Sequence, residues 1–292
     1  MRIAAQPIGW INDDFKDLGD DISLDRCLSE MREAGYEGTE LGRKFPKNPS
    51  QLKAALKPYG LSLASGWHSL HLLSKPYEEE EKKFLTHMQF LSEMKSQVVI
   101  VAECTHATYG SNGPHRHSAD SSHKIDAPTW QRLIEGLERL AETAKQNGMR
   151  LAYHHHMGTV IQNEEEIDRL MKDTRHLFLL ADTGHMAYAG IDPLPIFKKY
   201  GNRIAHIHLK DVRPQILAQA HQQGYSFEKA VREGVFTVPG DGGIHYAPLF
   251  QHLNDLGYEG WWVMEAEQDP IKANPLRYAK MGRDYIRKVA NL

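Results

Sequence analysis

Cysteine is scarce in this sequence, with only Cys27 and Cys104 among its 292 residues. The two lie far apart and form no CxxC pattern, so they cannot build a disulfide framework or a thiolate zinc site. We therefore expect a protein of a reducing compartment, the cytoplasm. The first ten residues carry one charge and no long apolar core, which argues against a signal peptide.

The sequence also lacks an excess of one charge and a long apolar run. Its 35 Lys and Arg nearly balance its 38 Asp and Glu, a net charge of −3. Proteins that bind nucleic acid through bulk charge show a basic excess, so we expect no nucleic-acid partner. No run approaches the ~18 apolar residues of a membrane span, so we expect no membrane association. Histidine, the commonest metal ligand, is abundant at 17 residues.

The Gly-x-Gly-x-x-Gly turn of dinucleotide-binding folds is absent after the first predicted strand. Short apolar runs instead alternate with amphipathic segments along the whole chain, as in a parallel sheet with right-handed crossovers. The predicted strands are Arg2–Ile8, Gly38–Leu41, Leu61–Trp67, Val98–Glu103, Arg150–His156, Leu177–Asp182, Ile204–Lys210 and Trp261–Glu265. The predicted helices are Leu24–Ala34, Ser50–Tyr59, Glu78–Met94, Thr129–Gln146, Asn163–Lys172, Pro193–Tyr200, Phe227–Glu233, Ala247–Leu256 and Leu276–Val289.

Eight such strand–helix units favour a closed barrel over an open sheet. We predict an α/β fold, a single (β/α)8 TIM-barrel domain over residues 1–292. Two connections are long, Thr105–Pro128 after strand 4 and Val212–Tyr246 after strand 7. The second is expected to carry one extra helix and a glycine-rich turn. Because both follow strands, both should lie on the face of the barrel that carries catalytic residues.

Nearly every predicted strand ends in a residue that could bind a metal or transfer a proton. Alternation along a strand puts His154 and His156 on one face, and likewise His206, His208 and Lys210. Glu265 and Glu267 also share a face. The barrel brings these strand ends to one point, so Asp182, His208 and Glu265 together indicate a metal site. Imidazole and carboxylate ligands without thiolate suit Mn²⁺, Co²⁺, Fe²⁺ or Zn²⁺ better than Mg²⁺.

The other histidines have simpler interpretations. We expect His155 and His206 to be hydrogen-bonded structural residues. The histidines of the loop after strand 4 are expected to be solvated; they are His106, His115, His117 and His123. Cys104 is expected to fill space beside Glu103.

Several longer stretches resemble the inosose dehydratases of the xylose-isomerase-like barrel superfamily. Asp182-Thr183-Gly184-His185 and the second histidine of His206-Ile207-His208 are patterns of the whole superfamily. The stretches that carry the resemblance to the dehydratases are Ile8–Asp14, Glu37–Gly42, His154–Thr159, His206–Pro214, Phe236–Gly242 and Glu265–Pro270. Among them, His154–Thr159, His208–Pro214 and Glu265–Pro270 are far more specific to the dehydratases than the superfamily patterns are. The resemblance runs from residue 3 to about residue 285.

The resemblance implies a divalent metal, Mn²⁺ or Co²⁺, held in the superfamily by Glu, Asp, His and Glu at the ends of strands five to eight. Asp182, His208 and Glu265 match that set, and the strand-five glutamate falls on His154. We assign the fourth position to His154, with His156 or water as alternatives. The resemblance also implies glutathione as a possible cofactor, although no residue of this sequence independently suggests it. A second departure is His245, where an acidic residue is expected after the glycine-rich turn.

The implied activity is a hydro-lyase reaction of inositol catabolism, which removes water from 2-keto-myo-inositol (scyllo-inosose), a cyclic polyol ketone. The ketone acidifies the neighbouring C–H, so a base, a metal and an acid are needed. We assign the base to His156 or Glu103 and the acid to His185 or Lys210. Substrate contacts are assigned to Glu40, His68, Asp211 and Arg213. The sequence does not exclude assembly into a homo-oligomer.

Three other functions are compatible with the same motifs. A ketose 3-epimerase or aldose–ketose isomerase would use the same metal-bound enediolate, but the missing strand-five glutamate argues against it. An endonuclease-like DNA binder is disfavoured by the net charge of −3. A non-catalytic protein that binds a metal or a polyol is the third alternative, and turnover with added Mn²⁺ would exclude it.

Overall fold

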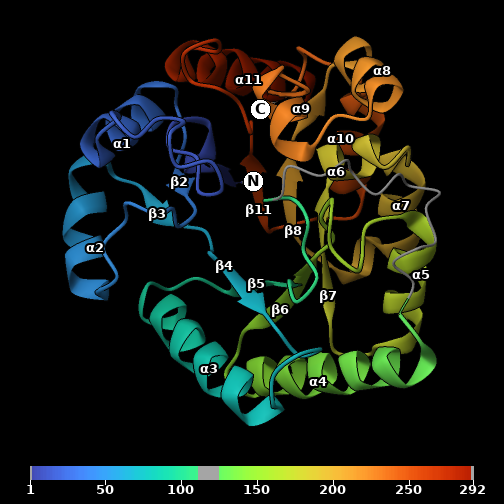
Figure 1. The fold of residues 1–292 in the computed structure, drawn as a ribbon. Coiled ribbons are helices and arrows are strands. Elements are labelled where there is room, and N and C mark those ends of the chain that lie inside the picture. The colour runs from blue at the N-terminus through green and yellow to red at the C-terminus, as the bar shows by residue number, and fades with distance from the viewer. Residues whose placement is uncertain (1, 111–124, 291–292) are drawn as a thin grey trace.

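The computed structural model describes residues 2–110 and 125–290, which form a parallel sheet wrapped by helices (Figure 1). The sheet follows the order β3-β2-β1-β11-β8-β7-β6-β5-β4, and every neighbouring pair is parallel. Its strands are β1 (Arg2–Ala5), β2 (Gly38–Thr39), β3 (Ser62–Leu63), β4 (Trp67–Leu70), β5 (Val98–Glu103), β6 (Arg150–His154), β7 (Phe178–Asp182), β8 (Ile204–Leu209) and β11 (Trp261–Met264).

The two edges of this sheet, β3 and β4, are successive parts of one chain segment. β3 pairs with β2, and β4 pairs with β5, so the segment closes the sheet into the predicted (β/α)8 barrel. The serine hydroxyls on either side reinforce the closure, because Ser65 donates to Val98 O (2.8 Å) and Ser96 donates to Leu63 O (2.9 Å). The prediction of one strand ending at Trp67 was wrong: the segment is broken in two and continues to Leu70.

Helices cover the outside of the barrel and connect successive strands (Figure 1). Several of them begin at good capping residues; Ser23, Asp126 and Asn163 each accept a backbone N–H of the first turn. The outer helices are α1 (Leu24–Glu33), α2 (Pro49–Leu56), α3 (Tyr77–Glu93), α4 (Ala127–Gln146), α5 (Glu164–Asp173), α7 (Pro193–Tyr200), α10 (Tyr246–Asp255) and α11 (Pro275–Val289). No helix among the described residues is long and apolar enough to cross a membrane.

The connection after strand 7 has more structure than predicted. It holds two helices, α8 (Pro214–Gln223) and α9 (Phe227–Arg232), where one was expected. It also forms a small antiparallel pair, β9 (Asp211–Val212) with β10 (Phe236–Thr237). A short helix that was not predicted, α6 (Thr183–Tyr188), follows β7 directly. In the connection after strand 4, His106 is exposed, and His115, His117 and His123 lie outside the described residues.

Strand alternation divides the barrel interior from the layer under the helices. A small apolar cluster fills the interior below the polar strand ends, and it consists of Val98, Ile100, Ala152, Leu180 and Ala205. His154 and Asp182 follow Ala152 and Leu180 by two residues, so they point to the same side as this cluster. The polar groups therefore sit on an apolar floor inside the barrel.

Candidate active site

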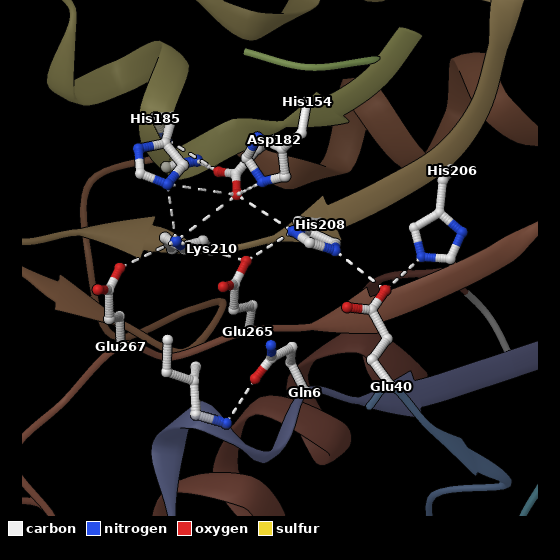
Figure 2. A network of polar contacts seen from close by, with 12 residues as sticks. Gln6, Glu40, His154, Asp182, His185, His206, His208, Lys210, Glu265 and Glu267 are labelled. Atoms are coloured by element: carbon white, nitrogen blue, oxygen red, sulfur yellow. Dashed lines mark hydrogen bonds and ion pairs between the residues drawn. The ribbon is translucent and has the colours of Figure 1, made fainter. Parts of the chain in front are cut away.

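Four ligand-type side chains meet at the carboxyl ends of adjacent strands (Figure 2). His154 ends β6, Asp182 ends β7, His208 lies near the end of β8, and Glu265 follows β11. One donor atom from each lies within 4.8 Å of the others, and all four side chains are buried. Three of these atoms, Asp182 Oδ2, His208 Nδ1 and Glu265 Oε2, have no hydrogen-bond partner among the described residues.

These three atoms face one another as ion pairs, but none makes a hydrogen bond, and a buried polar atom without one costs about 1–3 kcal/mol. Three such atoms at one point therefore fit an occupant. His208 Nδ1 is 2.6 Å from Glu265 Oε2 and 3.4 Å from Asp182 Oδ2, and His154 Nε2 is 3.6 Å from Asp182 Oδ2. Two carboxylate oxygens and two imidazole nitrogens that converge in this way match the donor set of a divalent transition metal. The residues present therefore fit the metal that the sequence resemblance implies.

Backbone and side-chain partners aim both imidazoles at this point. His154 Nδ1 lies 2.6 Å from His155 O, which leaves Nε2 free to act as a ligand. His208 Nε2 lies 3.1 Å from Glu40 Oε1, so its Nδ1 faces the other ligands. Burial opposes ionisation of Glu40, but His208 and His206 outweigh it and hold the pKa of this carboxyl well below its usual range. Glu40 thus orients His208 and also accepts from His206 (2.5 Å).

Lys210 brings a buried cation to the same place. Its Nζ donates to His185 Nε2 (3.0 Å) and to Glu267 Oε2 (3.3 Å), and the side chain is 1% exposed. It also lies 3.4 Å from Glu265 Oε2 and 3.6 Å from Asp182 Oδ2. Burial opposes the charge, but these carboxylates raise the pKa of Lys210, so it stays an ammonium.

His156, His185 and Glu267 form a second group of buried ligand-type side chains beside the first. The rings of His156 and His185 lie 3.9 Å apart between centroids. His156 Nδ1 lies 2.8 Å from Met157 O, and burial lowers the pKa of both imidazoles well below the ordinary value, so they are neutral. Burial raises the pKa of Glu267 to about 8, so this carboxyl holds its proton near neutrality.

His154, His156, His208, Glu265 and Glu267 open into a cavity of about 280 Å³. Asp182, His185 and Lys210 are not among its lining residues. Its walls include Gln6, Asp13, Asp14, Glu40, Arg43, Trp67, Tyr109, His154, His156, His208, Glu265 and Glu267. Trp67 presents its ring edge-on to His154 and His156, with centroids 5.3 and 5.8 Å apart. Burial and the neighbouring Asp13 raise the pKa of Asp14 to about 6. The size and polar wall suit one small polar ring.

Sequence reasoning assigned no role to several residues of this wall. Asp13 and Asp14 stand in one of the stretches that carry the family resemblance, and Glu267 shares a strand face with Glu265. Those two signals were available in the sequence. Nothing in the sequence marked Trp67 or Tyr109, because they come from a broken strand and from a loop.

Two predicted site residues point away from the cavity. Glu103 lies on the outer face of β5 with Val99 and Val101, and its carboxylate accepts the N–H groups of Leu72 (2.7 Å) and Thr105 (2.8 Å). It anchors the loops after β4 and β5, so the structure does not support it as a base.

His68 lies on β4 and faces helix α3. Its ring stacks on His87 (5.2 Å between centroids) and meets the edge of Phe84 (6.2 Å). It does not reach the cavity, because strand β4 continues beyond Trp67 and turns this side chain to the outside. The structure therefore does not support a substrate contact for His68.

Asp211 and Arg213 hold the connection after strand 7 instead of lining the cavity. The Asp211 carboxylate accepts four backbone N–H groups, from Val212, Gly240, Gly242 and Ile244. Arg213 pairs with Asp241 (2.7 Å). Both side chains were expected to contact substrate, and the structure gives them a role in shaping the loop. His245 is exposed and makes no capping hydrogen bond at the start of α10.

The buried His68 predicts that stability depends on pH. Burial, and then the neighbouring His87, lower the pKa of His68 from 6.5 to about 4; Glu80 opposes the shift, and His71 and Lys83 add to it. As the pH falls from 6.5 to about 4, the unfolded chain takes up a proton that the folded chain does not. The free energy of unfolding should therefore decrease over this window.

Urea unfolding near pH 7 and near pH 5 would measure this loss. We expect His68→Phe to lose less stability than the unsubstituted protein between the two conditions, since phenylalanine cannot titrate. Equal losses in the two proteins would mean that other groups carry the pH dependence.

Comparison with known proteins matches this chain to one family over most of its length. The family model for "Xylose isomerase-like TIM barrel" covers residues 28–289. An inosose dehydratase of Clostridium botulinum (strain Eklund 17B / Type B) is 47% identical over all of this chain and 98% of its own length. One of Geobacillus thermodenitrificans is 46% identical over the same shares.

Solved structures support the fold at low sequence identity. The probable 3-DHS dehydratase AsbF of Bacillus anthracis superposes with a TM-score of 0.72 at 16% identity, covering 98% of each chain. An L-ribulose 3-epimerase superposes with a TM-score of 0.68 at 16% identity, covering 99% of this chain and 94% of its own. At 16% identity, these two structures are evidence for the fold only.

Proposed function

The chain belongs to the inosose dehydratases, within the xylose isomerase-like TIM barrels, and from that premise we propose that it is a hydro-lyase that removes water from 2-keto-myo-inositol (scyllo-inosose). The product would be a trihydroxycyclohexane-1,2-dione. The observation that carries the proposal is that two buried groups of metal-ligand and proton-transfer side chains lie together, with His154, His156, His208, Glu265 and Glu267 facing one cavity. We propose the cytoplasm as its compartment, in keeping with its two free cysteines.

The cavity wall favours an uncharged substrate. Among the described residues that line it, Arg43 is the one arginine or lysine, and the carboxyl groups are Asp13, Asp14, Glu40, Glu265 and Glu267. A phosphorylated sugar would bring its anionic group against these carboxylates, whereas the hydroxyls of a polyol can donate hydrogen bonds to them. A cyclic polyol ketone therefore suits this wall better than a sugar phosphate.

A divalent metal, for which we propose Mn²⁺ or Co²⁺, would be held by His154, Asp182, His208 and Glu265. When bound it supplies Lewis-acid stabilisation of negative charge on substrate oxygens. Glu40 contributes by fixing the orientation of the His208 ring.

His156 is the proposed base. Its Nδ1 contacts the Met157 carbonyl, so the lone pair of Nε2 is free to take the proton from the carbon next to the ketone. Burial keeps the imidazole neutral and ready to accept. His156 lines the cavity, whereas the alternative base Glu103 does not.

Lys210 and Glu267 are proposed to supply the proton to the departing hydroxyl. Glu267 lines the cavity, and Lys210 donates to it from behind at 3.3 Å. The carbon–oxygen bond breaks as the new double bond forms, and the hydroxide leaves as water with that proton. His185, 3.0 Å from the Lys210 nitrogen, holds the ammonium in place.

Metal removal is the direct test of the activity. We expect the protein treated with a chelator and dialysed to lose activity toward scyllo-inosose, and Mn²⁺ or Co²⁺ to restore it. The assay follows the ultraviolet absorbance of the enolised dione. A parallel assay without glutathione tests whether that thiol, brought in by resemblance alone, is needed.

Two controls make the outcome decisive. Free ketohexoses should not interconvert, since the strand-five position holds His154 and not the second carboxylate that an epimerase would use. No loss of scyllo-inosose under any added metal would contradict the proposed function, and interconversion of ketohexoses would replace it by an epimerase.

A further inference from the structure

Two groups of ligand-type side chains lie side by side, and a lysine ammonium stands in one of them. His154, Asp182, His208 and Glu265 form the first group, and the second consists of His156, His185 and Glu267. Lys210 Nζ lies 3.0 Å from His185 Nε2 and 3.3 Å from Glu267 Oε2. The ammonium therefore contacts two of the three members of the second group, His185 and Glu267.

Two carboxylates of the first group, Asp182 and Glu265, also face this ammonium (Figure 2). Asp182 Oδ2 is 3.4 Å from His208 Nδ1 and 3.6 Å from Lys210 Nζ. Glu265 Oε2 is 2.6 Å from His208 Nδ1 and 3.4 Å from the same ammonium. Asp182 and Glu265 therefore face the first ligand group on one side and the ammonium on the other, which is where carboxylates stand between the two ions of a two-metal centre.

The Asp182–His185 segment is shaped around Lys210. Thr183 Oγ1 accepts from Lys210 N (3.1 Å) and donates to Lys210 O (2.9 Å), which fixes the lysine backbone. A Cβ on Gly184 would lie 2.4 Å from Lys210 Cγ and 2.7 Å from its Cβ and Cδ. Only glycine leaves room for the lysine stem there. In the motif Asp-Thr-Gly-His, the aspartate is a proposed metal ligand and the threonine fixes the lysine backbone. The glycine leaves space for the lysine stem, and the histidine contacts the ammonium.

The ammonium is buried beside an aromatic ring. Its side chain is 1% exposed, and its Nζ lies 4.8 Å from the centroid of the Phe236 ring. A buried charge is tolerated only where opposite charges and dipoles compensate it. The carboxyl groups of Asp182 and Glu265 lie 3.6 and 3.4 Å from the Lys210 nitrogen and supply that compensation.

We propose that the Lys210 ammonium takes the place of a second metal ion in the group of His156, His185 and Glu267, and so restricts this active site to one divalent ion. The inference rests on the proposed metal site of the dehydratase. Its consequence for the reaction is a second positive charge that is covalently attached and can donate a proton, which a metal ion cannot do.

The test is the number of metal ions bound per chain. Equilibrium dialysis of the intact protein against Mn²⁺ should give one ion for the unsubstituted protein and two for Lys210→Ala. The second ion should broaden the electron paramagnetic resonance spectrum through Mn–Mn coupling. Lys210→Met, which removes the charge but fills the space, should stay at one ion, as should Lys198→Ala on the outer surface of α7.

The double variant Lys210→Ala with His185→Gln tests where the second ion binds. It distinguishes binding in the second group from a general increase in metal affinity. It should return to one ion, because the second group has lost a ligand. One bound ion in Lys210→Ala, or two in the unsubstituted protein, would overturn the inference about Lys210. Neither result would contradict the proposed metal-dependent activity, which is tested separately with scyllo-inosose. No bound ion in the unsubstituted protein would overturn both.

Discussion

Replacing Asp182 with asparagine is expected to lower turnover of scyllo-inosose by on the order of 10³-fold or more and to release the metal. Its Oδ2 atom is one of the buried atoms of the ligand group that make no hydrogen bond, and it forms an ion pair with Lys210 Nζ at 3.6 Å. Removing that negative charge leaves the ammonium and the metal repelling each other. Several kcal/mol of charge stabilisation are lost, and each ~1.4 kcal/mol is a factor of ten in rate.

Asparagine is the informative replacement because it keeps the local fold. Asp182 Oδ1 accepts the N–H groups of Gly184 and His185, both at 2.8 Å, and so caps helix α6. Asparagine can still accept them, whereas Asp182→Ala also loses the cap, worth about 1 kcal/mol. Metal content, turnover and thermal unfolding should be measured for both variants. Full metal occupancy in Asp182→Asn would remove this residue from the ligand set.

Replacing His156 with glutamine should reduce turnover by roughly 10²–10⁴-fold, the usual contribution of a general base. The amide of glutamine cannot take a proton at neutral pH. The metal should stay bound, because His156 lies beside the ligand group and not in it. Turnover and metal content, measured on the same preparation, separate this loss from the loss expected for Asp182→Asn.

A histidine outside the cavity gives the matched control. His245 is exposed at the start of α10, so His245→Gln should leave turnover and metal content unchanged. Exchange of the substrate C–H with deuterated solvent gives a further readout, since a missing base should stop exchange as well as dehydration. Normal turnover in His156→Gln would assign proton abstraction to another group.

The strand faces show where the sequence was sufficient and where it was not. Alternation correctly predicted that His154 and His156 share a face, since both line the cavity. His155 instead accepts the backbone N–H of Asp182 through its Nε2 atom (3.3 Å). Alternation tells which residues share a face but not which face points to the barrel axis. In β5 both faces are apolar, so no contrast in polarity placed Glu103 on the outside.

The predicted substrate contacts of the loop residues were wrong for a different reason. Asp211 and Arg213 stand next to the site in sequence, and their charge suggested substrate contact. Their partners, among them Gly240, Gly242 and Asp241, lie about thirty residues further along the chain. A loop that folds back on itself forms hydrogen bonds between its own polar groups. No local sequence pattern predicts which of these groups will pair.

By itself the sequence determined the alternating strand–helix order, and with it a barrel whose strand ends gather Asp182, His208 and Glu265. That order follows from short apolar runs and the chirality of their connections, which are local properties. Only the tertiary structure decided that Glu40 orients His208, that Gly184 makes room for Lys210, and that Lys210 stands among the ligands of a second group. These contacts join residues from different strands, so they exist only once the barrel closes.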